Sequence, residues 1–343
     1  MARRLAIGLA LALFFLAPPG TAVAHAFGQR YDLPVPLWLY LYGASAAVLL
    51  SFVLVGFFVG GEHAPRRYPR FDLLSVGFFR ATLASRPFLL GLRVLSVALF
   101  LLVVASGLLG AQSPRLNFAP TFVWVIWWVG MGFFTAFVGN FWAVANPWRI
   151  LFEWADGLAR RLGVEEGLEM KTPYPASWGV WPAVALFFVF VWIELVFWGA
   201  ATPNNIVLLA LFYSSLTWTG MALFGKETWL RRGEVFSVFF GVLAKFAPTE
   251  TRVKGTALCV NCRECFARAA PEERELNLRP PAAGLFLPEE HSVSRLVFVV
   301  FMLAAVTCDG LMATAPWVEL FGFFFPFLEA LGGWGGSVFA TVG

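Results

Sequence analysis

The sequence predicts an all-α, polytopic helical membrane protein with six to seven transmembrane helices after an N-terminal signal peptide. Of its 343 residues, 59% are hydrophobic and only 13% are charged, which is about half the charged share of soluble domains. The apolar residues are gathered in runs long enough to cross the ~30 Å hydrocarbon core of a bilayer. The basic residues are concentrated in alternate loops between these runs, as in multi-pass proteins.

Residues 1–24 have the three parts of a secretory signal peptide. A positively charged start is followed by an apolar core and then by a Pro-Pro-Gly break. Small residues then permit cleavage after Ala24, which would make His25 the mature N-terminus, or after Ala26, which would remove it. An uncleaved membrane anchor is the third alternative.

Six apolar segments follow, and each is predicted to cross the membrane. They cover residues 35–60, 87–110, 120–145, 176–198, 205–224 and 294–315. A seventh apolar stretch, 317–343, is interrupted by glycines and has no polar tail, so we expect a truncated chain or a re-entrant end. The predicted organisation is a signal peptide (1–24), a membrane domain of five spans (25–224), a cytoplasmic loop (225–293) and a C-terminal membrane segment (294–343).

The loops predict the orientation of the chain. Loops 61–86, 146–175 and 225–293 hold most of the Lys and Arg, whereas loops 111–119 and 199–204 hold one Arg between them. The positive-inside rule therefore makes the basic loops cytoplasmic. The signal peptide independently requires the mature N-terminus to lie outside. Because the basic residues form no continuous stripe, the expected partner is the lipid bilayer and not a nucleic acid.

One cytoplasmic segment, 146–163, predicts a helix that lies on the membrane surface. Asn146 suits the N-cap, Pro147 suits the first helical position, and Gly163 suits the end of the helix. Its apolar residues share one face, which favours a surface anchor. A helix that docks a partner protein is the alternative.

A cysteine motif, CVNCRECF, stands in the longest predicted cytoplasmic loop. Cys259, Cys262 and Cys265 have the spacing that begins a bacterial ferredoxin motif, but Ala269 stands where the fourth cysteine would be. His291, in the same loop, could complete a Cys3His zinc site. Because the cytoplasm is reducing, we expect a disulfide to be the least favoured use of these residues. Zinc, an iron–sulfur cluster and three free thiols remain the alternatives.

Polar residues within the predicted spans are further candidates, because they are costly in lipid and often functional. These residues are Asn140, Glu194 and Asp309. Glu194 and Asp309 are expected at one depth, where they could bind a cation or relay protons, or where each could simply end a helix at the headgroup level. His25 is a candidate copper ligand through its imidazole and α-amine, and an ordinary residue beside a cleavage site is the alternative.

Six stretches carry a resemblance to a known family. They are AHAFGQRYDLPVPLWLYLYGAS (24–45), NPWRILFEW (146–154), YPASWGVWPAVALFFVFVWIELVF (174–197), RRGEVFSVFFGVLAKFAP (231–248), LRPPAAGLF (278–286) and TCDGLMATAPW (307–317). These stretches resemble bacterial polytopic membrane proteins labelled fenitrothion hydrolase. The resemblance covers most of the chain but includes no catalytic signature.

The resemblance implies a membrane-bound enzyme of the bacterial inner membrane that hydrolyses an organophosphorus triester, together with other membrane subunits. It carries over no catalytic residue, and the cysteine motif is not a feature of that family. Members of the family are longer at the C-terminus, which agrees with a truncated chain. The residues themselves leave two other functions open. One is a membrane redox or metal-binding subunit that uses the cysteines, and the other is a transporter or channel that uses Glu194 and Asp309.

Overall fold

The fold is known from a computed structural model. The structure describes residues 68–255, 259–261, 263–287 and 292–312, with single residues at 42, 45, 46, 49 and 323. The predicted signal peptide, most of the predicted span 35–60 and nearly all of 317–343 lie outside the described residues.

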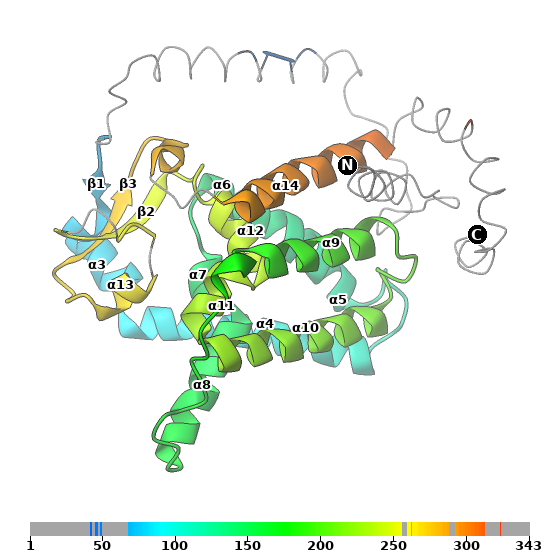
Figure 1. The fold of residues 1–343 in the computed structure, drawn as a ribbon, viewed down its shortest axis with the longest axis horizontal. Helices are drawn as coiled ribbons and strands as arrows, with labels where there is room; N and C mark the ends of the chain where they lie inside the picture. The colour runs from blue at the N-terminus through cyan, green and yellow to red at the C-terminus, as the bar shows by residue number, and fades with distance from the viewer. Residues whose placement is uncertain are drawn as a thin grey trace.

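Within the described residues, five helical segments are long and apolar enough to cross a membrane. They are α4 (Arg86–Leu109), the continuous helix α5–η2–α6, α9 (Trp181–Leu195) with the preceding η3 (Ala176–Trp178), α10 (Pro203–Phe224) and α14 (Val293–Met312). Figure 1 shows α9 between α14 and α10. These helices are compatible with an integral membrane protein in contact with lipid. Four of them, all but α5–η2–α6, match the predicted spans 87–110, 176–198, 205–224 and 294–315 to within a few residues.

The predicted span 120–145 was too long. The continuous helix consists of α5 (Phe118–Pro120), the π-helical η2 (Thr121–Gly130) and α6 (Met131–Phe137), and the short α7 (Trp142–Ala145) is separate. The chain turns at Gly139, where a Cβ atom would overlap the side chain of Thr249. Asn140 therefore lies in this turn and not inside a span, and its side-chain oxygen accepts a hydrogen bond from Ala143 N at 3.2 Å.

A small sheet lies at one end of the helices (Figure 1). It consists of β1 (Phe71–Asp72), β3 (Arg274–Leu278) and β2 (Thr249–Val253), in that order and antiparallel. Its register pairs Thr249 with Leu278 and Val253 with Arg274. The all-α prediction missed this sheet, because its strands are short and lack the regular apolar alternation that marks a strand in a sequence.

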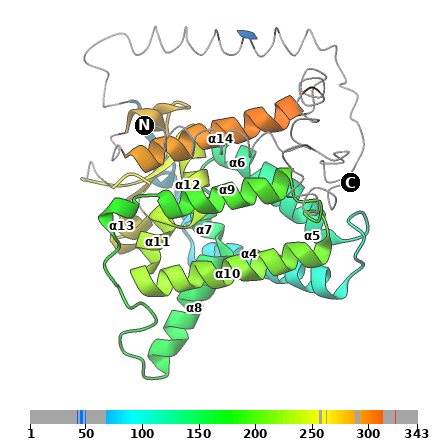
Figure 2. The same cartoon turned by 45° about the vertical axis from the view of Figure 1, so that its right-hand side comes forward.

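Further helices lie outside the five long segments. Near β1 they are η1 (Leu73–Ser75) and α3 (Gly77–Leu83), and between the spans they are α8 (Pro147–Arg161), α11 (Lys226–Arg232), α12 (Val235–Leu243), α13 (Arg263–Arg268) and η4 (Ala283–Phe286). The predicted surface helix 146–163 is confirmed as a helix. Its N-cap is Asn146, whose side chain accepts from Arg149 N at 3.1 Å. Figures 1 and 2 show α8 leaving the bundle at the end that carries the sheet.

A buried carboxylate ties the sheet together. Glu250 on β2 is 1% exposed, and it pairs with Arg279 at 2.7 Å and with Arg70 at 2.5 Å. Tyr68 also donates a hydrogen bond to it at 2.5 Å. Burial opposes ionisation of Glu250, but the hydrogen bonds from Tyr68 and Arg70 outweigh it and lower its pKa. A charge buried in this way is stable because its oxygens are paired.

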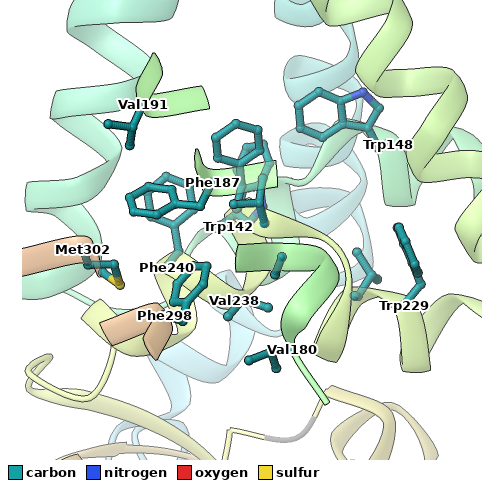
Figure 3. Packing of buried hydrophobic residues seen from close by; sticks show 14 of the residues in the cluster. Trp142, Trp148, Val180, Phe187, Val191, Trp229, Val238, Phe240, Phe298 and Met302 are labelled. Carbon is teal, nitrogen blue, oxygen red and sulfur yellow. The ribbon is translucent and has the colours of Figure 1, made fainter. Parts of the chain in front are cut away.

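The core of the bundle is aromatic. Trp142, Phe187, Phe240 and Phe298 are almost fully buried in one cluster, and Figure 3 shows how their rings pack. The rings of Trp142 and Phe240 have their centroids 5.5 Å apart and are tilted, an arrangement that aromatic pairs favour. The apolar helix α12 packs into this cluster, which explains why so short a segment is so hydrophobic.

Candidate functional site

A polar cavity of about 430 Å³ lies where α7, α8, α11 and α12 meet residues 259–266, which carry the cysteine motif and are called the cysteine segment below. Its volume is in the range typical of ligand sites. Among the described residues that line it, the basic side chains are Arg149, Arg231, Lys245, Arg263 and Arg295, and the acidic ones are Glu227 and Glu264. The charged side chains around the cavity are therefore mostly basic. It lies at the end of the bundle that the sequence predicts to be cytoplasmic.

An ion-pair network supports one wall of the cavity. Glu153 on α8 pairs with Arg149 at 2.9 Å, with Lys226 at 3.1 Å and with Arg93 of α4. Arg149 also pairs with Glu227 of α11. Burial opposes ionisation of Glu153, but the charge of Arg149 outweighs it and the pKa of Glu153 falls to about 2. Glu153 is therefore an anion at neutral pH and holds three cations from different elements in place.

Arg263 also lines the cavity, close enough to this network to interact with its charges. Its guanidinium donates a hydrogen bond to the carbonyl of Ala143. Burial and the neighbouring charges of Arg149 and Arg93 lower the pKa of Arg263 to about 10. The surroundings of Arg263 thus disfavour its positive charge, which Glu153 and Glu227 compensate only in part. A bound anion would relieve this unfavourable electrostatic energy.

The cysteine segment forms another part of the wall. Val260, Asn261, Arg263 and Glu264 all line the cavity. Asn261 fixes the segment to β2, because its backbone N–H donates to the Thr251 carbonyl at 2.8 Å and its side chain accepts from Thr251 N at 3.0 Å. Asn261 has a left-handed backbone with φ 52°, a conformation that Asn tolerates better than most residues. These four side chains are therefore held beside the cavity.

The structure joins Cys259 and Cys265 in a disulfide, with their Cα atoms 5.9 Å apart. The expectation that a disulfide would be the least favoured use of these cysteines was therefore wrong for this pair. The spacing of the motif did not reveal that α13 folds Cys265 back against Cys259. Cys262 and His291 lie outside the described residues.

No metal site is formed by the residues that the structure describes. Among them, no group of three or more His, Cys, Asp or Glu side chains is placed to hold an ion. The sulfur atoms of a disulfide are also not the thiolates that zinc or an iron–sulfur cluster requires. Zinc and an iron–sulfur cluster at Cys259, Cys262, Cys265 and His291 remain predictions for the reduced protein.

The two predicted intramembrane carboxylates lie on neighbouring helices. Helices α9 and α14 pack against each other, and Asp309 on α14 is close enough to act electrostatically on Glu194 on α9. Glu194 also accepts a hydrogen bond from Trp128 Nε1 at 2.7 Å, whereas Asp309 is exposed on its helix. His25, the predicted copper ligand, lies outside the described residues. Asn140 lines the polar cavity instead of the membrane interior.

The sequence prediction missed Glu234, a fully buried carboxylate between the cavity and the core. Its oxygens accept hydrogen bonds from Asn146 Nδ2 at 3.2 Å and from the Tyr213 hydroxyl. They also accept from the backbone N–H groups of Phe236 and Ser237 at the start of α12. Glu234 is the N-cap of α12. The residues that usually signal an N-cap are Ser, Thr, Asp and Asn, so the local sequence gave no standard signal for this role.

Comparisons with protein-family models, with curated proteins and with solved structures find no match for this chain. The similarity to the fenitrothion hydrolases therefore stays a prediction. The arguments for function below depend on the site itself.

Proposed function

We propose that this integral membrane protein binds a phosphate-bearing anion in the polar cavity. The proposal is supported mainly by the excess of basic over acidic side chains around the cavity. Arginine suits this ligand, because its planar guanidinium forms paired, charge-assisted hydrogen bonds with phosphate oxygens. Arg263 is the best placed of these residues, because it lines the cavity and its burial and neighbouring cations disfavour its charge.

The proposal includes the orientation that the sequence predicts. In it, the chain has six to seven spans, lies in the bacterial inner membrane and has its mature N-terminus outside. The polar cavity then faces the cytoplasm, because it is lined by loops 146–175 and 225–293. Phosphorylated compounds would reach it from that side.

A hydrolase of the fenitrothion type is a narrower form of this proposal. It is supported by the sequence resemblance and by the arginines, which could stabilise negative charge that develops on phosphoryl oxygens in a transition state. We assign no catalytic base. The test is an assay of aryl phosphotriester hydrolysis by the purified protein with its partner subunits and added divalent metals. Absence of turnover would exclude this narrower form.

Phosphate binding is tested by calorimetric titration of the purified full chain in nanodiscs with inorganic phosphate and diphosphate. We expect Arg263→Gln to weaken binding by about 10-fold or more, because a hydrogen bond to a charged group contributes about 1.5–3 kcal/mol. The matched control is Arg268→Gln, because Arg268 is on the same helix and its side chain is 79% exposed. No binding by the unmodified protein, or equal weakening by both variants, would contradict the proposal.

A second candidate function is thiol–disulfide exchange, and it is motivated by the Cys259–Cys265 disulfide. Cytosolic disulfides are usually transient and either catalytic or redox-sensing. In this reaction, the two thiols lose two electrons and two protons while a partner disulfide, such as oxidised glutathione, is reduced to two thiols. Mass spectrometry after alkylation, across a series of glutathione ratios, tests it. Full alkylation of both cysteines at every ratio would exclude this function.

A further inference from the structure

We propose that the phosphate group is the head of a lipid whose apolar chain lies in a second cavity, inside the membrane domain. This inference rests on the proposed phosphate binding and names the class of ligand. It commits to one source of the phosphate, a phosphate-bearing lipid and not a soluble metabolite. Three features of the structure support it.

The first feature is an apolar cavity of about 320 Å³ between α4, η2, α9 and α10. Its walls include Val103, Trp124, Trp127, Phe190, Leu209 and Ala210. An apolar cavity of this kind favours a hydrocarbon occupant over water, because water would find few hydrogen-bond partners there. One of its walls is π-helical, and such segments are frequent at functional sites.

The second feature is the partition between the two cavities. Trp142 lines both of them. Along the following turn, Pro147 and Trp148 line the apolar cavity, while Asn146 and Arg149 line the polar one. The apolar and polar cavities are therefore adjacent, and this stretch of chain lines both of them.

The start of α12 continues the same partition. Phe236 lines the apolar cavity, and the next residue, Ser237, lines the polar one. The arrangement matches a molecule with one anionic end and one apolar end. A soluble phosphate would use the polar cavity and leave the apolar cavity without a ligand.

The third feature is the indole N–H of Trp142. Trp142 is 3% exposed, and its Nε1 has no hydrogen-bond partner among the described residues. A buried donor without an acceptor is costly. Because Trp142 borders both cavities, the phosphate or ester oxygens of a lipid that passes it would supply the missing acceptor.

The test compares inorganic phosphate, ethyl phosphate and hexyl phosphate as ligands of the full chain, purified without lipid in a non-ionic detergent, with the uptake of each ligand by protein-free micelles subtracted. Burial of each additional CH2 group favours binding, so the four extra CH2 groups of hexyl phosphate should raise its affinity strongly if its chain enters the apolar cavity. We expect hexyl phosphate to bind at least 10-fold more tightly than ethyl phosphate. Equal affinity for the two would overturn the lipid inference, whereas phosphate binding would stand. No binding of any of the three would overturn both proposals.

A cavity-filling variant tests whether the alkyl chain of the ligand lies in the apolar cavity. We expect Ala210→Trp to remove the difference between hexyl and ethyl phosphate and to leave the affinity for inorganic phosphate unchanged. The matched control is Ala304→Trp, because Ala304 is exposed on α14 and lies outside the apolar cavity. A chain-length effect that persists in Ala210→Trp would contradict this placement. If Ala210→Trp does not fold, the chain-length series on the unmodified protein decides the lipid inference.

Discussion

Glu234 shows how one buried carboxyl group can organise several elements. Its carboxylate accepts two backbone hydrogen bonds at the start of α12, at 2.8 and 3.0 Å. Asn146 and Tyr213 donate to it from the start of α8 and from α10. Each of these four groups donates to a carboxyl oxygen of Glu234, so both of its oxygens are satisfied. This side chain belongs to the structural support of the site.

Glu234→Gln should destabilise the protein by about 2–4 kcal/mol. The glutamine amide would place N–H donors against donors and leave buried groups unpaired. Unfolding in a chemical denaturant measures the change, with Glu166→Gln as the exposed control. Equal free energies of unfolding for the two variants would contradict this structural role.

Protonation of Glu153 in acid should lower the free energy of unfolding. Its pKa is about 2 in the folded state and about 4.5 in a model peptide, so its contribution to stability is fully present above about pH 4.5. That contribution is lost as the pH falls from about 4.5 to about 2, because protonation breaks the pairs with Arg149 and Lys226. The shift corresponds to at most ~3 kcal/mol.

The measurement compares the free energies of unfolding of the unmodified protein and Glu153→Gln between pH 2 and pH 7. The difference between the two should shrink as the pH falls through this window. The comparison matters because Glu250 also has a lowered pKa and titrates in both proteins. A difference that is independent of pH would show that Glu153 is not ionised in the folded protein.

Helices α4 and α10 approach each other closely at Gly107. A Cβ atom there would overlap Val207 and lie 2.8 Å from the Pro203 carbonyl oxygen. Membrane helices commonly pack through small residues in this way. Lipid tails are as apolar as the helix side chains, so helix association depends on close van der Waals packing and not on the hydrophobic effect. The packing of this helix pair therefore depends on one glycine.

Gly107→Ala should destabilise the α4–α10 contact by about 1–3 kcal/mol, because the backbone must shift to admit the methyl group. The matched control is Gly91→Ala on the same helix, where a Cβ atom would meet nothing within 4 Å. The control should be neutral or slightly stabilising, because alanine favours helix. Thermal unfolding in detergent distinguishes the two, and equal shifts would contradict the close approach.

The boundaries of most helices followed from local patterns. Pro87 and Pro203 stand in the first turns of α4 and α10, and the side chain of Ser85 accepts from Phe88 N at 3.3 Å. These signals lie within a few residues of the helix ends that they set, so they can be recognised in the sequence. The strands gave no comparable signal, because β1 has two residues and pairs with β3 more than 200 residues away.

The polar cavity is a property of the complete fold. Its walls come from α7, α8, α11, α12, the cysteine segment and the start of α14. Arg263 contacts Ala143, a residue 120 positions earlier in the chain. No spacing in the sequence could indicate this contact, because it depends on how the helices pack.

The orientation of the whole chain can be tested with one exposed position on the sheet-bearing end. Arg268→Cys, in a variant without other cysteines, should react with a membrane-impermeant maleimide in inverted vesicles and not in intact spheroplasts. The physical reason is the concentration of basic residues in the loops around this end. Labelling in spheroplasts would reverse the orientation and place the polar cavity outside.

Composition and hydrophobic periodicity were enough to predict a multi-pass helical protein and the position of most spans. Lipid acts on each segment separately, so a run of about 20 apolar residues carries its own signal. Only the tertiary structure revealed four other features: the Cys259–Cys265 disulfide, the sheet, the buried Glu234 and the two cavities that Trp142 borders. Each of them arises where segments distant in the chain meet. Such contacts form only when the helices have packed, so no local pattern in the sequence indicates them.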